Sequence, residues 1–309
     1  MAFNLATFRT RALSSVVFVL IMAAGVLWNE WSFFILFSII HFGCWLEYQK
    51  LVGLIDKEYA TITSFHKYGV IIAGWCMMLY ATPDSSGLFG IRLHALGWWM
   101  GLVFVFVLPI VELLFANNIR LKNIAHSAFG LVYLSLSCAL MIDLYDHKFQ
   151  VSNEGVPFAK EPFAHIGAAY AWFIPAFVIV CMWINDTMAY IVGSLIGRTP
   201  FSSISPKKTW EGTIGGIILC IAAAGYLGHV LNKPESAEFV HIPYYHWYII
   251  AGIAAIAGTA GDLLESKLKR LAGVKDSGNL MPGHGGFLDR FDSLLLATPF
   301  VWLYLHLIA

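Results

Sequence analysis

Hydrophobic residues fill this chain in long runs that short polar segments separate. A helix that crosses the hydrocarbon core of a bilayer needs about 20 mostly apolar residues. Nine runs reach or approach that length, at 12–28, 31–48, 68–81, 95–115, 124–143, 165–184, 212–231, 246–263 and 288–307. The pattern therefore predicts an all-α, polytopic integral membrane protein with about nine transmembrane helices.

The sixth run raises a question about helix continuity. The polar pair Asn185–Asp186 follows it, and a further apolar piece, TMAYIVGSLIG, comes directly after the pair. Either one long helix extends beyond the membrane here, or the helix breaks near the polar pair. No internal repeat and no low-complexity tract interrupts the chain, so we expect one membrane domain over residues 1–309.

Composition supports the membrane interpretation. Of the 309 residues 59% are hydrophobic and 12% are charged, whereas soluble proteins carry about a quarter charged residues. The 19 basic residues balance the 19 acidic ones, so no bulk field favours nucleic acid as a partner. The cysteines lie far apart in apolar runs without a CxxC pair, which predicts small buried side chains and neither a zinc site nor a disulfide framework. They are Cys44, Cys76, Cys138, Cys181 and Cys220.

The distribution of lysine and arginine predicts the orientation, because these residues accumulate on the cytoplasmic side of a membrane. With the N-terminus inside, 15 of the 19 basic residues fall on the cytoplasmic side and four outside. The loops 198–211 and 264–287 then face the cytoplasm, and the outer loop 146–162 is a solvated connection. Arg9 and Arg11 precede the first run, which we interpret as a membrane anchor and not as a signal peptide.

Carboxylates gather around the final run. Asp289 and Asp292 are three residues apart, so they share one face in the first turn of the predicted helix. Together with Asp262, at the end of the eighth run, they are candidate ligands for Mg²⁺, which takes carboxylates, waters and substrate phosphate. The alternatives are acids that favour a helix N-terminus and, for Asp262, a carboxylate neutralised by lysine or arginine. Asp186 raises the same question with weaker support.

Cations and glycines lie between those carboxylates. Lys267, Lys269, Arg270 and Lys275 precede a glycine-rich stretch, PGHGG at 282–286, whose backbone N–H groups can face a phosphate at a helix N-terminus. Anchoring by the positive-inside rule explains the charges but not the glycines. His284 is a candidate phosphate donor or acid–base group, although a lone histidine is more often structural.

The other cytoplasmic loop, SSISPKKTWEG at 202–212, adds Lys207, Lys208 and Trp210. Two lysines beside turn-forming residues can bind a polyphosphate, and a tryptophan at this depth is ordinary interface material. Metal-capable carboxylates, cations and a close-approach loop at headgroup depth favour phosphoryl-type transfer, which depends mainly on positioning and charge neutralisation. The substrates we infer are one lipid and one nucleotide.

The segment from Ser266 to Asp292, S-x2-K-R-x4-K-D-x-G-x3-P-G-H-G-G-x2-D-R-x-D, closely resembles the signature of phosphatidate cytidylyltransferases, also called CDP-diacylglycerol synthases. SPKKTWEG at 205–212 and NDTMAY at 185–190 are similar to further family segments. The resemblance implies that CTP and phosphatidate give CDP-diacylglycerol and pyrophosphate with Mg²⁺, accompanied in relatives by a monovalent cation such as K⁺. It also implies a homodimer and a bacterial inner membrane with the active site facing the cytoplasm. Residues 1–145 would supply N-terminal helices, and 165–309 the catalytic helices and cytoplasmic loops.

The resemblance assigns roles to individual residues of this chain. The metal ligands would be Asp262, Asp289 and Asp292. The catalytic residues would be Lys269, Arg270, Lys275, Asp276, His284 and Arg290. The substrate-binding residues would be Ser205, Lys207, Lys208, Trp210, Ser266, Gly285 and Gly286.

Two other functions fit parts of the pattern. A CDP-alcohol phosphatidyltransferase would use D-x2-D-G-x2-A-R followed by G-x3-D-x3-D, but here the last two steps are each one residue too short and the A-R element is absent. A transporter would place acidic residues along an ion path through the membrane, whereas these charges collect on one side.

Overall fold

A computed structural model describes residues 5–88, 90–115, 120–146, 172–231, 244–278 and 285–308. Within these ranges nearly every residue is helical, and the two short strands β1 (Gly87–Leu88) and β2 (Ile91–Arg92) pair antiparallel between two helices. The helices are α1 (Leu5–Leu27), α2 (Glu30–Ile55), η1 (Tyr59–Thr61), α3 (Ser64–Tyr80), α4 (Leu93–Phe115), α5 (Leu121–Gly130), η2 (Leu131–Leu136), α6 (Ser137–Asp146), α7 (Phe173–Ile196), α8 (Trp210–Leu231), α9 (Tyr244–Leu271) and α10 (Leu288–Ile308).

Seven helical segments in the described ranges are long and apolar enough to cross a membrane. They are α2, α4, the continuous stretch Leu121–Tyr145, α7, α8, α9 and α10. The first and third predicted runs correspond to the shorter apolar segment Leu13–Leu27 of α1 and to the 17 residues of α3. These segments confirm the all-α, polytopic architecture predicted from the sequence. The physical reason is that a chain in lipid must satisfy its backbone polar groups within helices.

Helix α7 answers the question about the sixth run. It continues unbroken for 24 residues through Asn185 and Asp186 to Ile196. The side-chain amide of Asn185 lies 3.4 Å from Oγ1 of Thr259 on α9, so this polar group has a partner outside its own helix. The first part of the predicted run, 165–171, and the outer loop from 147 onward lie outside the described residues.

The fifth run forms one helix with an irregular middle turn, because α5 passes through the π-helical segment η2 into α6. Oγ of Ser135 in this turn accepts a hydrogen bond from Nε1 of Trp45 at 2.8 Å and lies 2.9 Å from Nε2 of His41. A Cβ atom at Gly74 would lie 2.0 Å from the same hydroxyl oxygen. The wider turn therefore coincides with a buried polar cluster that only a glycine on α3 accommodates.

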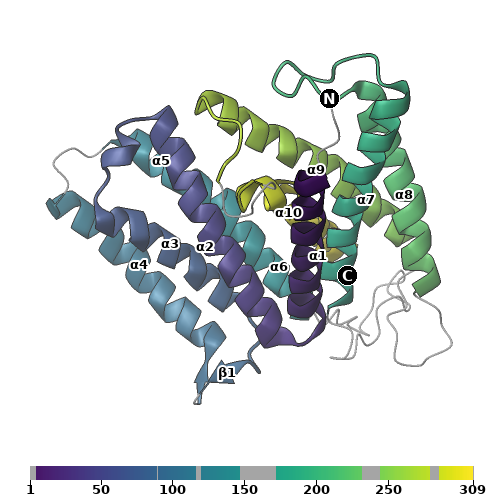
Figure 1. The fold of residues 1–309 in the computed structure, drawn as a ribbon. Coiled ribbons are helices and arrows are strands. Elements are labelled where there is room, and N and C mark those ends of the chain that lie inside the picture. The colour runs from purple at the N-terminus through teal and green to yellow at the C-terminus, as the bar shows by residue number, and fades with distance from the viewer. Residues whose placement is uncertain are drawn as a thin grey trace. The chain divides into compact units, whose positions relative to one another are not determined.

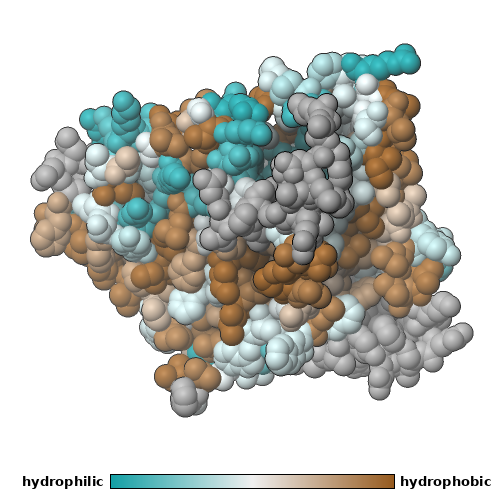
Figure 2. All heavy atoms as spheres, in the orientation of Figure 1, coloured by the Kyte–Doolittle hydropathy of each residue, from teal (hydrophilic) through white to brown (hydrophobic). Residues whose placement is uncertain are grey.

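The described chain divides into two compact units. The first comprises 1–143 and 265–292, and the second comprises 144–264 and 293–309. In the first unit α3 packs along α4 (Figure 1), where a Cβ atom at Gly97 would lie 2.4 Å from the backbone nitrogen of Tyr80. The opposite surface of α4 is exposed and apolar (Figure 2), as expected for a helix side in contact with lipid. The single membrane domain stays a prediction.

In the second unit α7 and α8 run side by side (Figure 1). Small residues bring the two backbones together, since a Cβ atom at Gly216 would lie 2.7 Å from Cβ of Ala189, and one at Gly212 2.8 Å from the carbonyl oxygen of Ala189. This close packing fixes the start of α8 against the middle of α7. The five cysteines are free and buried in their units, as the sequence predicts.

Candidate active site

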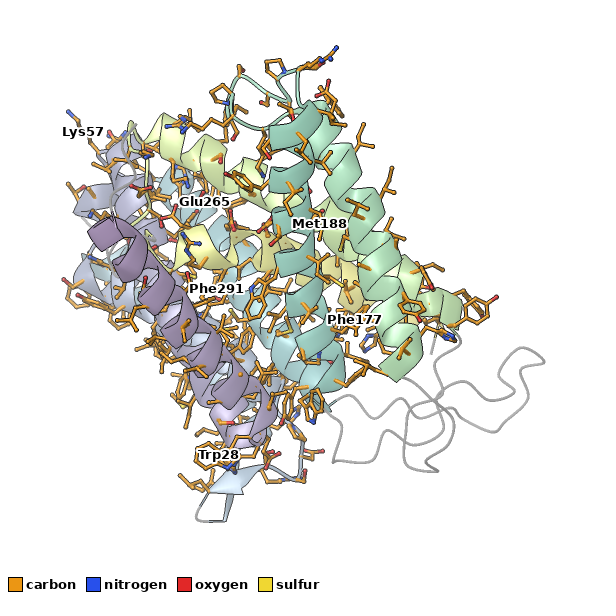
Figure 3. All side chains as sticks on the ribbon, turned by 45° about the vertical axis from the view of Figure 1, so that its right-hand side comes forward. Trp28, Lys57, Phe177, Met188, Glu265 and Phe291 are labelled. Carbon is orange, nitrogen blue, oxygen red and sulfur yellow. The ribbon has the colours of Figure 1, made fainter. Side chains whose placement is uncertain are left out.

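A lysine lies between two carboxylates in the first unit. Nζ of Lys269, near the end of α9, is 2.5 Å from Oε2 of Glu265 one turn earlier and 2.6 Å from Oδ1 of Asp289 in the first turn of α10. Glu265 (labelled in Figure 3) is fully buried, and the side chains of Lys269 and Asp289 are 14% and 9% exposed. Charges buried to this degree require partners, and the ammonium group lies between the two carboxyl groups, where its single positive charge offsets one negative charge.

The other oxygen of Asp289 is held by the loop that precedes α10. Oδ2 accepts the backbone N–H groups of Ser277 at 2.9 Å and Gly286 at 2.8 Å, and it lies 2.9 Å from Oγ of Ser277. Gly285 has φ +86°, and a Cβ atom there would lie 2.6 Å from this oxygen. The carboxylate is therefore fixed by a conformation that only glycine adopts readily.

A glutamate from the first half of the chain binds the same loop. Glu47 on α2 accepts the N–H of Phe287 through Oε1 and the N–H of Leu288 through Oε2, both at 2.9 Å. Oγ of Ser277 also lies 2.7 Å from Oε2. The sequence predicts that backbone N–H groups of 282–286 face a phosphate. In this structure the N–H of Gly286 is bound by Asp289, and the next two N–H groups, of Phe287 and Leu288, are bound by Glu47.

The remaining signature residues of the first unit lie around this cluster. Asp292 is buried three residues further along α10, and Ser266 is half-buried on α9. The side chains of Arg270, Lys275, Asp276 and Arg290 are exposed. His284, with Pro282 and Gly283, lies outside the described residues, so its predicted role stays a prediction.

The second unit contains a cavity of about 610 Å³. Its walls come from α7, the loop 197–209, the start of α8 and the part of α9 that belongs to this unit. Asp186, Lys207, Lys208 and Asp262 supply charge, and Ser205 and several threonines supply hydroxyl groups. Lys208 forms an ion pair with Asp262, so the carboxylate predicted as a metal ligand is neutralised by a lysine here. A cavity with two lysines and many hydroxyl groups is suited to phosphate groups.

The loop 197–209 has a defined shape because it is bonded across its base. Its ends are joined by hydrogen bonds from Phe201 N to the Lys208 oxygen at 2.7 Å and from Trp210 N to the Thr199 oxygen at 2.9 Å. Glu211, in the first turn of α8, accepts the hydroxyl of Thr199 at 2.8 Å and the N–H of Arg198 at 3.2 Å. This closed loop positions Ser205, Lys207 and Lys208 at the cavity.

Trp210 has a packing contact in this loop. Its ring meets that of Phe201 edge-on, with the ring centroids 4.4 Å apart, and half of the side chain is exposed. In the described part of the chain Trp210 does not line the cavity. Its predicted role in substrate binding stays a prediction, and the structure gives it a role in the shape of the loop.

The carboxylates have the chemistry of ligands for a hard divalent cation. Among the residues that the structure describes, no group of three or more His, Cys, Asp and Glu side chains lies close enough to hold a metal ion. Lysine ammonium groups neutralise Asp289 and Asp262 instead. A divalent cation can offset the negative charge that the ammonium group offsets here, so these carboxylate oxygens suit Mg²⁺ as ligands. The shared site of Asp262, Asp289 and Asp292 stays a prediction.

Sequence reasoning missed four residues of the two clusters. Glu47, Glu265 and Ser277 contact or flank Asp289, and Glu211 closes the second loop. The sequence offered one signal for Glu47 and Glu265, which lie in α2 and α9. An ionisable side chain within an apolar helix is a functional candidate by default.

Fold and site together define a polytopic membrane protein with lysine–carboxylate groups formed by α9, by the start of α10 and by the loop before α8. A sequence profile of the Cytidylyltransferase family matches residues 9–308, and the chain belongs to this family. It is 30% identical over 275 residues to a phosphatidate cytidylyltransferase from Haemophilus influenzae, an alignment that covers 83% of this chain and 82% of that protein.

Two further relatives match over shorter segments. The chain is 34% identical over 215 residues to phosphatidate cytidylyltransferase 5, chloroplastic, from Arabidopsis thaliana, covering 65% of this chain. It is 43% identical over 132 residues, 42% of this chain, to a phosphatidate cytidylyltransferase from Bacillus subtilis. These alignments span 50% and 46% of the two relatives' own lengths.

Proposed function

We propose that this protein is a phosphatidate cytidylyltransferase, which transfers the CMP group of CTP to phosphatidate and releases pyrophosphate. One observation carries the proposal: in a member of the cytidylyltransferase family, the signature residues form two groups in which a lysine neutralises a carboxylate. Such groups suit the binding of phosphate anions. The named relatives support the choice of CTP and phosphatidate.

The proposed reaction joins two anions. A phosphate oxygen of phosphatidate attacks the α-phosphorus of CTP, the new P–O bond forms, and the bond to the β-phosphate breaks to release pyrophosphate. Phosphatidate is already ionised at neutral pH, so the nucleophile needs no strong general base. The requirement is to hold two negatively charged substrates together, and Lys207, Lys208 and Lys269 would supply positive charge. Lys207 and Lys208 line the cavity of the second unit, and Lys269 contacts Asp289 in the first.

Magnesium is part of the proposal. Asp262, Asp289 and Asp292 would hold Mg²⁺, with K⁺ as a candidate second cation, and the ion would neutralise phosphate charge when bound. The lysines would then be released from their carboxylates to bind phosphate oxygens. Removal of divalent ions with EDTA should silence the enzyme, and added Mg²⁺ should restore it.

The location of the site is a further part of the proposal. On the family resemblance we place the protein in a bacterial inner membrane as a homodimer. On the distribution of basic residues we place the loops 198–211 and 264–287 at the cytoplasmic face. Because the five native cysteines are buried, Lys275→Cys provides a selective label. A membrane-impermeant maleimide should react with it in inverted vesicles and not in right-side-out vesicles. The reverse pattern would overturn the orientation.

The central test uses purified protein in detergent with phosphatidate, CTP and Mg²⁺, and follows pyrophosphate and CDP-diacylglycerol. Asp289→Asn and Asp292→Asn should abolish product formation while the protein still inserts and folds. If either variant converts CTP at nearly the wild-type rate, the metal assignment is wrong. If the wild-type protein makes no CDP-diacylglycerol but, when supplied with CDP-diacylglycerol and an alcohol acceptor, transfers the phosphatidyl group to the alcohol and releases CMP, a CDP-alcohol phosphatidyltransferase is the better interpretation.

A further inference from the structure

Glu47 is an acid inside an apolar helix, in the sequence FGCWLEYQK. Its carboxylate accepts the backbone N–H groups of Phe287 and Leu288 and lies near the hydroxyl group of Ser277, at 2.7 to 2.9 Å. These contacts join residues at least 230 positions apart in the sequence. A charged group in a membrane-spanning helix is costly and is retained where a specific partner compensates it.

The carboxylate of Glu47 occupies the N-terminus of α10. The first N–H groups of a helix have no partner within the helix, and the helix dipole favours a negative charge beside them. Usually a nearby residue in the sequence caps these groups. Here α2 supplies the cap for Phe287 and Leu288, so the position of the first turn of α10, which carries Asp289, depends on α2.

Glycines leave room for this approach on both sides. A Cβ atom at Gly278 would lie 2.1 Å from Oε1 of Glu47, and one at Gly286 would lie 2.2 Å from Oε2. On α2 itself, a Cβ atom at Gly43 would lie 2.3 Å from the ring of Phe287. Each of these three positions therefore carries glycine, the one residue type that leaves room for the contact between Glu47 and the residues around the start of α10.

Ser277 connects Glu47 to Asp289. Its Oγ lies 2.7 Å from Oε2 of Glu47 and 2.9 Å from Oδ2 of Asp289. A hydroxyl group has one proton to donate, so it serves one carboxylate at a time. The two acids are thus coupled through a shared donor, and a change at Glu47 alters the hydrogen bonding of Asp289.

We propose that Glu47 is a positioning residue of the active site, which holds Asp289 through Ser277 and through the first turn of α10. Glu47 touches no reacting atom in this role. This positioning role rests on the proposed cytidylyltransferase function only where the test measures activity. It differs from a purely structural cap, because a cap would change stability alone, whereas a positioning residue also sets the response to the divalent cation.

The first test is Glu47→Gln, which keeps the shape of the side chain but turns one acceptor into a donor facing an N–H group. We expect kcat to fall about 10- to 100-fold, as for residues that orient metal ligands, with the KM for phosphatidate unchanged. The Mg²⁺ concentration for half-maximal activity should rise by a similar factor. Glu30→Gln, on the same helix where Glu30 accepts a hydrogen bond from Ser86, is the matched control and should behave as wild type.

A binding measurement separates this inference from the proposed function. Mn²⁺ binding followed by electron paramagnetic resonance requires no turnover, and Glu47→Gln should weaken it about 10-fold or more. Equal Mn²⁺ binding and an equal Mg²⁺ response in Glu47→Gln and Glu30→Gln would overturn the positioning role. Failure of the wild-type protein to form CDP-diacylglycerol would count against the proposed function instead.

Ser277→Ala keeps the test decisive if Glu47→Gln does not fold. This variant removes the shared hydroxyl group but leaves Glu47 on the N–H groups of Phe287 and Leu288. We expect a smaller shift in the same direction for the Mg²⁺ response and for Mn²⁺ binding. If Ser277→Ala changes neither quantity, Glu47 is a cap only, and the proposal is wrong.

Discussion

Nζ of Lys269 lies 2.6 Å from Oδ1 of Asp289 and so places a positive charge against a carboxylate of the family signature. The same ammonium group lies 2.5 Å from Glu265, which is fully buried. The contacts Lys269–Asp289 and Lys208–Asp262 each join a residue predicted to bind phosphate to a residue predicted to bind metal. The buried group around Lys269 should therefore matter for stability as well as for activity.

Lys269→Met should leave Glu265 and Asp289 without their cation. Removing one partner of a buried ion pair costs about 3–5 kcal/mol of unfolding free energy. We therefore expect lower thermal stability in detergent together with a loss of activity. Lys267→Met, an exposed lysine two residues earlier on α9, is the control and should change stability little. Unaltered stability and activity in the Lys269 variant would contradict the proposed role of this lysine.

The pair Lys208–Asp262 should matter for activity more than for stability. Both side chains are about a quarter to a third exposed, at 29% and 27%, and such pairs contribute about 0–1 kcal/mol to stability. We expect Lys208→Gln to raise the KM for CTP about tenfold, equivalent to the loss of one charge-assisted hydrogen bond. Thermal melts of Lys208→Gln, Asp262→Asn and the double variant should agree with wild type within that small range. Arg198→Gln, in the same loop, serves as the control, and a rise in KM there of the same size would show that the effect is general.

Two glycines with left-handed backbone form a matched pair. Gly273 has φ +71° and open space where a Cβ atom would stand, whereas at Gly285, with φ +86°, a Cβ atom would lie 2.6 Å from Asp289. Gly273→Ala should cost about 1 kcal/mol of stability from backbone strain alone and leave activity unchanged. Gly285→Ala should also displace Asp289 and remove most activity. Equal kinetics in the two variants would show that the contact with Asp289 is unimportant.

Asp56 predicts a stability change at acid pH. The hydrogen bond from Lys122 lowers the pKa of this carboxyl, and the N–H of Glu58 and the nearby His126 act in the same direction. Because the folded-state pKa lies below the unfolded one, the stabilisation is present above about pH 4 and is lost as the pH falls through the folded value. In melting curves recorded from about pH 3 to about pH 6, Asp56→Asn should flatten this acid-side slope. Asp84→Asn, at an exposed aspartate, should leave the slope intact.

The sequence predicted the helices well because lipid leaves the backbone few alternatives. The apolar runs correspond to helices from α1 to α10, and the polar pair at 185–186 did not interrupt α7. The ends were less accurate. Helix α9 continues to Leu271, past the predicted end at 263, because the charged turn after Asp262 extends the helix beyond its apolar part. Apolar runs measure the lipid-compatible length of a helix and not its full length.

The site was predictable only where its residues are neighbours in the sequence. Lys269 and Asp289 lie within one signature segment, and their contact follows the expected clustering of charges. The contact of Glu47 with Leu288 could not be predicted, because no periodicity in α2 indicates a contact with a residue so far along the chain. The glycines of the signature predict room for a phosphate, whereas at Gly285 and Gly286 carboxylates of the protein itself take that room. Long-range packing, which the pattern does not encode, decides that difference.

The contact between Glu47 and the N-terminus of α10 has a consequence for how the protein is made. The ribosome synthesises α2 some 240 residues before Phe287. At about 5–20 residues per second the glutamate enters the bilayer roughly 10 to 50 seconds ahead of its partner. Nascent chains that end before α10 therefore contain Glu47 but not Phe287 and Leu288, whose N–H groups it binds. Under the proposed function, catalytic competence then arrives only after α10 has been synthesised, so that shorter chains in the membrane do not consume nucleotide.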